Sequence, residues 1–310
     1  MQGKGHYNMR MTVQMEKVNY AGWPQCIRLA NQNIELIATT DIGPRIIRFG
    51  FIGGANLFKE FPDVGKTGGD VWRNYGGHRL WHAPETRPRS YIPDNGPVAH
   101  EWNGTTLKLI QAVEAPTGIQ KEIEITLSPR QDSVAVKHRL TNKGLWPVEL
   151  APWALSVMQG PGRAILPQEP PGMEMLPVRP VGMWGYTNMT DARWKWGAKF
   201  IQLASDPAAT KPQKFGLGNS LGWAVYYREG QVFLKRFAFH AEATYPDFGC
   251  NVECYTRGDM LEVESLGPLT KLAPTAAVEH DEHWYLSKAT IGESDDEIEA
   301  ALAPLLRQCQ

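Results

Sequence analysis

Short segments with the alternating pattern of β-strands recur along this 310-residue chain, and they constrain its fold more than any other feature. In Gln120–Leu127, Ile123, Ile125 and Leu127 alternate with polar residues, which is typical of an antiparallel strand with one buried face. About fifteen short strands and one helix predict an all-β fold of stacked sheets or a large sandwich. The other main predicted strands are Asn33–Thr40, Arg45–Ile52, Thr105–Val113, Ser133–Thr141, Val148–Met158, Lys199–Leu203, Leu221–Arg228, Gln231–Phe239, Cys250–Thr256, Met260–Leu266 and Ala277–Ser287.

Two regions depart from the strand pattern. Residues 159–190 are rich in proline and glycine, which predicts a long connection over the surface. Near the end, Ser294 and Glu297 form a capping box before an apolar stripe, so we expect a helix over about 294–308 that Pro304 kinks or ends. We expect a single domain over 1–310, with an N-terminal lead at 1–20 and a core at about 33–287.

Charge and cysteine usage exclude several classes of protein. The 32 basic and 33 acidic residues are evenly mixed, which gives no electrostatic footprint for nucleic acid. No stretch approaches the roughly 20 apolar residues of a membrane span, and Met1–Glu16 lacks the apolar region of a signal peptide, although the true start methionine stays open. On one strand, Cys250 and Cys254 would lie roughly 13 Å apart, too far for a disulfide. A reducing, cytoplasmic location is the simplest interpretation.

One short segment concentrates chemical groups. It carries two imidazoles, a guanidinium, an indole and a carboxylate, at His78, His82, Arg79, Trp81 and Glu85. Gly76 and Gly77 before it and Pro84 after it predict a loop that enters a short strand. Strand alternation would place the two histidines on one face, with Arg79 and Trp81 on the other, whereas an irregular segment could bring both sets together. A turn-capping histidine and a core tryptophan are the structural alternatives.

Three segments together resemble the galactose mutarotase-like superfamily, the aldose 1-epimerase supersandwich. They are Asp41–Glu60, Val136–Val148 and Met260–Pro274. Three others, Gly76–Glu85, Tyr245–Glu253 and Glu279–Trp284, are similar to a bacterial subfamily of it, the DUF4380 proteins. The resemblance runs from about Asn33 to Leu286, and it implies a supersandwich of large antiparallel sheets with a sugar site on a concave face.

The resemblance also implies roles for individual residues. Aldose ring opening needs a base for the anomeric hydroxyl and an acid for the ring oxygen. The resemblance places the base at Glu264, which shares a strand face with Glu262. His78 or His82 is the candidate acid, because an imidazole titrates near neutral pH. Arg79 corresponds to the ligand-holding arginine of the superfamily.

The chain departs from the mutarotase pattern at one position. Mutarotases carry a second essential histidine on the strand after the Thr-Asn turn, where this chain has Pro152 and Trp153. Simple mutarotase activity would therefore require His82, His240 or another group to replace that acid.

Other residues are candidates for ligand contact. Because aromatic faces are the usual partners of sugar rings, stacking platforms are expected at Trp81, Trp153 and Trp184. Further ligand-contact candidates are Glu85, His240, Glu253 and Glu262. His138 reads as a packed strand residue, while His280 and Glu282 could share a face, which leaves a metal as an open alternative.

Three hypotheses follow. The first is an epimerase-like enzyme acting on a sugar or sugar acid through histidine and glutamate acid–base chemistry. The second is a carbohydrate-binding protein without turnover, and the third is a lyase or isomerase of sugar acids. We expect a small-molecule carbohydrate as partner, with no metal, cofactor, nucleic acid or membrane. Neither the sugar nor the oligomeric state follows from the sequence.

Overall fold

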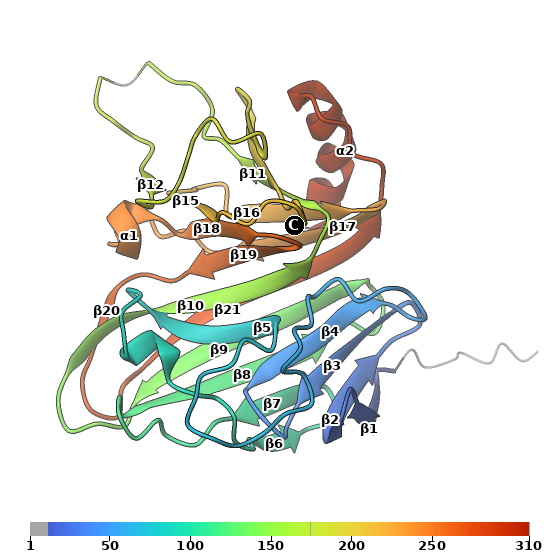
Figure 1. Cartoon of the computed structure of the whole chain (residues 1–310), viewed down its shortest axis with the longest axis vertical. Helices are drawn as coiled ribbons and strands as arrows, with labels where there is room; N and C mark the ends of the chain where they lie inside the picture. The colour runs from blue at the N-terminus through green and yellow to red at the C-terminus, as the bar shows by residue number, and fades with distance from the viewer. Residues whose placement is uncertain (1–11, 174, 310) are drawn as a thin grey trace, which may run out of the picture.

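The computed structural model describes residues 12–173 and 175–309, in which almost all regular structure is β. Two large antiparallel sheets are present (Figure 1). The first sheet has eleven strands, in the order β1 (Gln14–Tyr20), β2 (Trp23–Ala30), β3 (Ile34–Thr39), β4 (Arg45–Phe51), β5 (Gly77–Ala83), β10 (Val148–Gln159), β19 (Met260–Leu266), β18 (Val252–Arg257), β15 (Gln213–Leu217) and β12 (Val181–Met183), with β20 (Thr270–Leu272) beside β10.

The second sheet has ten strands within the same described residues. Their order is β13 (Trp194–Trp196), β14 (Phe200–Ala204), β11 (Arg163–Pro167), β16 (Trp223–Arg228), β17 (Gln231–Phe237), β21 (Ala277–Lys288), β9 (Ser133–Asn142), β8 (Ile119–Leu127), β7 (Thr106–Ile110) and β6 (Ala99–Trp102). The helical elements are a 3₁₀ turn η1 (Arg89–Tyr91), a single turn α1 (Pro246–Gly249) and α2 (Asp295–Gln308). Among the described residues, no helix is both long enough and apolar enough to cross a membrane.

The two sheets bury one large hydrophobic core between them. At its centre Trp284 of β21 lies against Phe49, Phe58 and Phe233, with ring centroids 5.6 to 5.7 Å away. All four rings are at most 1% exposed, so each buries its full apolar surface. Figure 1 shows α2 beside the second sheet, where Ile298 and Leu302 pack in a smaller core.

The all-β prediction is confirmed, with corrections at both ends and in the long connection. The proline-rich stretch at 159–190 contains β11 and β12, and the expected N-terminal lead contains β1. The helix expected over about 294–308 is confirmed as α2, which continues through Pro304 to Gln308, so Pro304 does not end it. Pro304 removes only one hydrogen bond, and the packing of the neighbouring Leu302 and Leu305 keeps the last turn helical. All four cysteines are free and buried, so Cys250 and Cys254 do not form a disulfide, as predicted.

The chain enters β5 through two glycines that no other residue could replace without strain. Gly76 and Gly77 have φ of +86° and +70°, in the left-handed region that favours glycine. A Cβ at Gly76 would lie 1.9 Å from the carbonyl oxygen of Lys59, because the two backbones pass in direct contact. This close approach positions the strand that carries His78, Arg79 and Trp81.

We expect Gly76→Ala to lower the free energy of unfolding by several kcal/mol. Gly53→Ala is the matched control, because Gly53 also has a positive φ, of +70°, but an added Cβ there meets no atom within 4 Å. The control should lose only about 1–2 kcal/mol of stability, which is the cost of the backbone strain. Urea unfolding of both variants measures the difference, and equal losses would show that the contact with Lys59 carries no cost.

Candidate functional site

A cavity of about 480 Å³ lies on the face of the first sheet that points away from the core. Leu80, Leu261 and Val263 point into the core, so their strand neighbours point to the opposite face. Seven aromatic side chains line this cavity together with six charged ones. The aromatic residues are Trp72, Trp81, Tyr91, Trp153, Trp184, Tyr186 and Tyr255, and the charged residues are Glu85, Arg79, Arg87, Lys214, Arg257 and Glu262.

Strand register places the central residues of this site side by side. On β10, Trp153 lies opposite Trp81 of β5, and Leu155 lies between Arg79 of β5 and Glu264 of β19. The rings of Trp81 and Trp153 meet edge to face, with centroids 5.4 Å apart. Residues from distant parts of the chain therefore form one continuous wall.

Two buried cations share three buried carboxylates at this wall. Arg79 Nη2 donates to Glu262 Oε1 at 3.2 Å. Lys214 Nζ of β15 lies 2.8 Å from Glu253 Oε2 and 3.2 Å from Glu264 Oε2. The ammonium group also lies 4.7 Å from the ring centre of Trp153, a favourable cation–π arrangement.

Burial and the surplus of carboxylates shift the pKa values of these charged groups. Burial raises the pKa of Glu253 well above its ordinary value, and repulsion from Glu264 adds to this although Lys214 opposes it. Burial also raises the pKa of Glu262, with Arg79 opposing and Glu264 reinforcing the shift. For Lys214, burial alone would lower the pKa, but Glu253 and Glu264 hold it well above the ordinary value. Lys214 is therefore an ammonium ion, and burial favours the protonated form of Glu253.

The cavity contains six of the residues that the sequence singled out. These are Arg79, Trp81, Glu85, Trp153, Trp184 and Glu262. Glu85 lies at the exposed rim, where it accepts a hydrogen bond from Tyr91. Glu253 and Glu264 lie behind Lys214 and are fully buried, and Trp153 Nε1 donates to Glu264 Oε2 at 2.7 Å.

The structure places the three candidate histidines outside this cavity. Strand β5 alternates regularly, so His78 and His82 lie on the face opposite Arg79, and the two sets do not converge. His82 is buried, with Nε2 3.5 Å from Glu114 Oε2, beside a separate cavity of about 220 Å³. His240 is exposed in a loop, and its backbone N–H donates to the Tyr245 hydroxyl.

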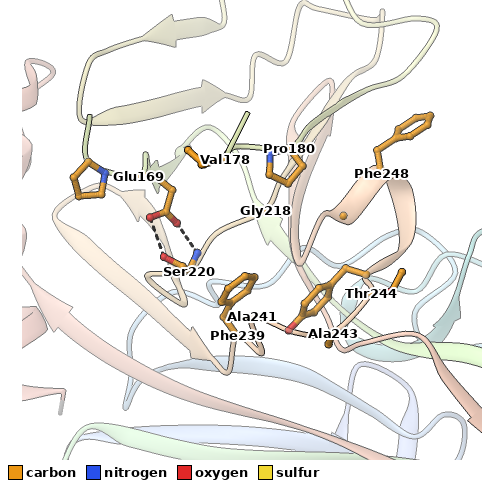
Figure 2. A pocket seen from close by; sticks show the side chains of 13 residues that line it. Glu169, Val178, Pro180, Gly218, Ser220, Phe239, Ala241, Ala243, Thr244 and Phe248 are labelled. Atoms are coloured by element: carbon orange, nitrogen blue, oxygen red, sulfur yellow. Dashed lines mark hydrogen bonds between the residues drawn. The ribbon is translucent and has the colours of Figure 1, made fainter. Parts of the chain in front are cut away.

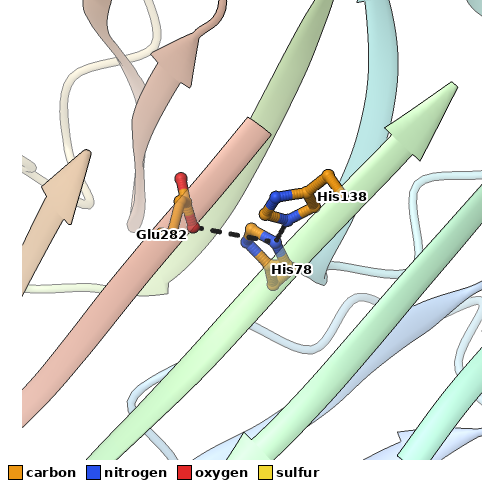
Figure 3. Close-up of side chains that lie close together, drawn as sticks. All are labelled: His78, His138 and Glu282. Carbon is orange, nitrogen blue, oxygen red and sulfur yellow. Dashed lines mark hydrogen bonds and ion pairs between the residues drawn. The ribbon is translucent and has the colours of Figure 1, made fainter. Parts of the chain in front are cut away.

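His78 belongs to a polar cluster between the two sheets, with His138 and Glu282 (Figure 3). Two histidines and a carboxylate are donors that transition metals use, but each ligand atom already has a partner. His78 Nε2 is 2.7 Å from His138 Nε2, and Glu282 Oε1 is 2.8 Å from Lys235 Nζ. Glu282 Oε2 accepts from Trp284 Nε1 at 2.7 Å. The cluster is satisfied by hydrogen bonds, and His138 is the packed strand residue that the sequence predicted.

The sequence did not indicate Lys214 or Tyr186 as residues of the site. Lys214 lies in a short strand, β15, whose five residues are all buried. That strand was not predicted because prolines and glycines surround it. A buried lysine needs a counter-ion, so the strand assignment would have indicated a charged site.

A larger surface pocket, of about 690 Å³, lies elsewhere (Figure 2). Glu169 accepts hydrogen bonds from the backbone N–H and hydroxyl of Ser220 there, at 2.6 and 2.8 Å. Its other walls are mainly apolar, including Pro180 and the exposed Phe248. Glu169 is the only charged side chain among the described residues that line this pocket, so the pocket offers a small ligand few charged groups for orientation.

Solved structures establish the fold. The chain resembles a proposed aldose 1-epimerase from Klebsiella pneumoniae, with 10% identity and a TM-score of 0.61 over 95% of this chain and 87% of that one. It also resembles a galactose mutarotase-like protein from Lactobacillus casei, with 9% identity and a TM-score of 0.58 over 84% and 100%. No family model and no curated protein sequence matches the chain.

A third similar structure is a TPR-domain containing protein from Parabacteroides distasonis, with 14% identity and a TM-score of 0.59. The match covers 86% of this chain and 48% of that one, so the chain spans about half the length of that protein. Identities this low define the architecture alone. The chain has the galactose mutarotase-like fold.

Four buried histidines predict an acid-sensitive fold. Burial is the main reason that the pKa values of His78, His82, His138 and His280 are lowered, to about 3 for His280. These imidazoles are neutral when folded, whereas the unfolded chain protonates them below about pH 6.5. Stability is therefore complete above that pH and decreases below it, by up to about 1.4 kcal/mol per pH unit for each histidine.

Urea unfolding at pH 7.5, 6.5 and 5.5 measures this dependence. The exposed His100 supplies the control, because His100→Gln should leave the slope unchanged. Glu253 and Glu262, whose pKa values burial raises, act in the opposite direction, so the net decrease is smaller than the sum over the four histidines. A free energy of unfolding that rises as the pH falls from 6.5 to 5.5 would contradict the prediction.

Proposed function

We propose that this protein binds a sugar in the cavity beside β5, β10 and β19 and interconverts its anomers, as an aldose 1-epimerase would. The observation that carries the proposal is the meeting of an aromatic wall with Arg79, Glu262 and Lys214 in one cavity. Trp81, Trp153 and Trp184 provide faces for stacking on the apolar side of a sugar ring, and the charged groups provide directional hydrogen bonds.

The proposed reaction uses one carboxylate and one ammonium group. Glu262 takes the proton of the anomeric hydroxyl as the bond between C1 and the ring oxygen breaks, and Lys214 gives a proton to that oxygen. Rotation about the next carbon–carbon bond presents the other face of the aldehyde. Ring closure then returns both protons to their original groups, so no cofactor is consumed. Because burial raises the pKa of Glu262, its carboxylate is a stronger base than usual.

Glu264, the base implied by family resemblance, is proposed to position Lys214 instead. It is fully buried, and its Oε2 already accepts from Trp153 and Lys214. A sugar could reach Glu264 only after Lys214 moved away, whereas Glu262 lines the cavity directly. We also propose that the chain belongs with the DUF4380 proteins, to which Gly76–Glu85, Tyr245–Glu253 and Glu279–Trp284 are similar.

Binding without turnover is the second candidate function. No histidine lines the cavity among the described residues, and Lys214, bound by two carboxylates, is a weak acid. Those two observations favour a protein that recognises a sugar and releases it unchanged.

Saturation-transfer NMR of anomer exchange separates the two candidates. With D-glucose, D-galactose and their uronic acids as probes, the wild type should accelerate exchange for at least one sugar. Glu262→Gln should remove about 10²- to 10⁴-fold of that acceleration, since it removes the base. Glu264→Gln should lose less, and the exposed Glu101→Gln should match the wild type.

Each contrary result has a distinct meaning. A greater loss in Glu264→Gln than in Glu262→Gln would return the role of base to Glu264. Background exchange by the wild type with sugar binding retained would establish the binding protein. Background exchange with no binding of any probe would overturn both functions.

A further inference from the structure

Arg79 holds hydrogen-bond donors without partners at the wall of the cavity. The side chain is only 5% exposed, and its Nη2 donates to Glu262. Its Nε and Nη1 are buried and find no hydrogen-bond partner among residues 12–173 and 175–309. Buried donors that stay unpaired are costly, so an arrangement that keeps them at a cavity wall points to an acceptor supplied by a ligand.

The surroundings hold the Arg79 guanidinium in place but offer it no second anion. It lies 4.7 Å from the ring centre of Trp81, which fixes its plane. Arg45, directly opposite on β4, is also buried, and its Nη2 and Nη1 donate to Asp94 and to the Gly76 carbonyl, so Asp94 balances the charge of Arg45. Glu262 is therefore the only carboxylate that pairs with Arg79 among the residues that the structure describes.

Most of the charged side chains that line the cavity are cationic. Four cations and two carboxylates line it, and the buried Glu253 and Glu264 lie behind Lys214. Glu262 beside Arg79 would repel a phosphate dianion more strongly than a carboxylate, which carries one charge.

We propose that the ligand is a sugar acid, whose carboxylate accepts hydrogen bonds from the free guanidinium nitrogens of Arg79. The planar guanidinium has fixed donor directions that suit a carboxylate. The sugar ring then extends along Trp81 and Trp153 towards Lys214 and Glu262. This inference rests on the proposed function, because it assumes that this cavity is the sugar site, and it names the class of sugar.

Isothermal titration calorimetry with closely matched probes tests the inference. D-glucuronate and D-galacturonate carry the carboxylate, D-glucuronamide replaces it with a neutral amide of the same shape, and D-glucose and D-galactose lack it. The wild type should bind one of the uronates at least tenfold more tightly than either the amide or the parent sugars. This comparison needs no variant, so it stands even where a substitution in the site impairs folding.

Two variants locate the effect. Arg79→Gln should abolish the preference for the uronate over its amide, whereas Arg79→Lys should keep part of that preference. The exposed Arg130→Gln removes the same charge outside the cavity and should behave as the wild type. Thermal melting of each variant identifies any loss of fold.

Other outcomes overturn the inference in ways that can be told apart from failure of the proposed function. Equal affinity for glucuronate and glucuronamide, with neutral sugars bound, would remove the carboxylate site and leave the sugar site intact. Tighter binding of D-glucose 6-phosphate than of both uronates would assign the cavity to phosphate. Unchanged uronate preference in Arg79→Gln would place the carboxylate elsewhere, and binding of none of these sugars would overturn both proposals.

Discussion

The pairing of β10 with β5 on one side and β19 on the other is the constraint on which the rest of this structure depends. It fixes which side chains of three distant segments share a face, because neighbouring residues on a strand point to opposite sides. Leu155 lies between Arg79 and Glu264 in this register. A slip of one residue would exchange the two faces and place charged residues in the core. The large apolar core therefore selects the register that also assembles the site.

Buried charge lies on both sides of these central strands, and one contact links the core side to strand β19. In the core, Lys235 pairs with Glu282 at 2.8 Å and donates to the backbone carbonyl of Val263 at 3.1 Å. Val263 stands between Glu262 and Glu264, so the core lysine holds the same strand that supplies the carboxylates of the cavity. Removing one partner of a buried pair is far more costly than losing an exposed one, which makes this region intolerant of change.

Much of the fold and part of the site could be predicted from local patterns. Strands with one buried face, such as Gln120–Leu127, could be predicted because apolar and polar residues alternate in them, and the apolar ones face the core. The strands β11, β12 and β15 escaped prediction because they are short and lie among prolines and glycines. Arg79, Trp81 and Glu262 were recognised as candidates, whereas Lys214 was not, since its counter-ions come from β18 and β19 and are remote in the sequence.

By itself the sequence determined the all-β class, the strand faces on which His78 and Arg79 stand, and the pairing of Glu262 with Glu264 on one face. Each of these depends only on the period of two in an extended chain. The tertiary structure alone decided which of these faces meets the cavity, and it placed the histidines in the core and Arg79 at the wall. The reason is that burial depends on which sheet covers a face, and that follows from contacts between segments that are remote in the sequence.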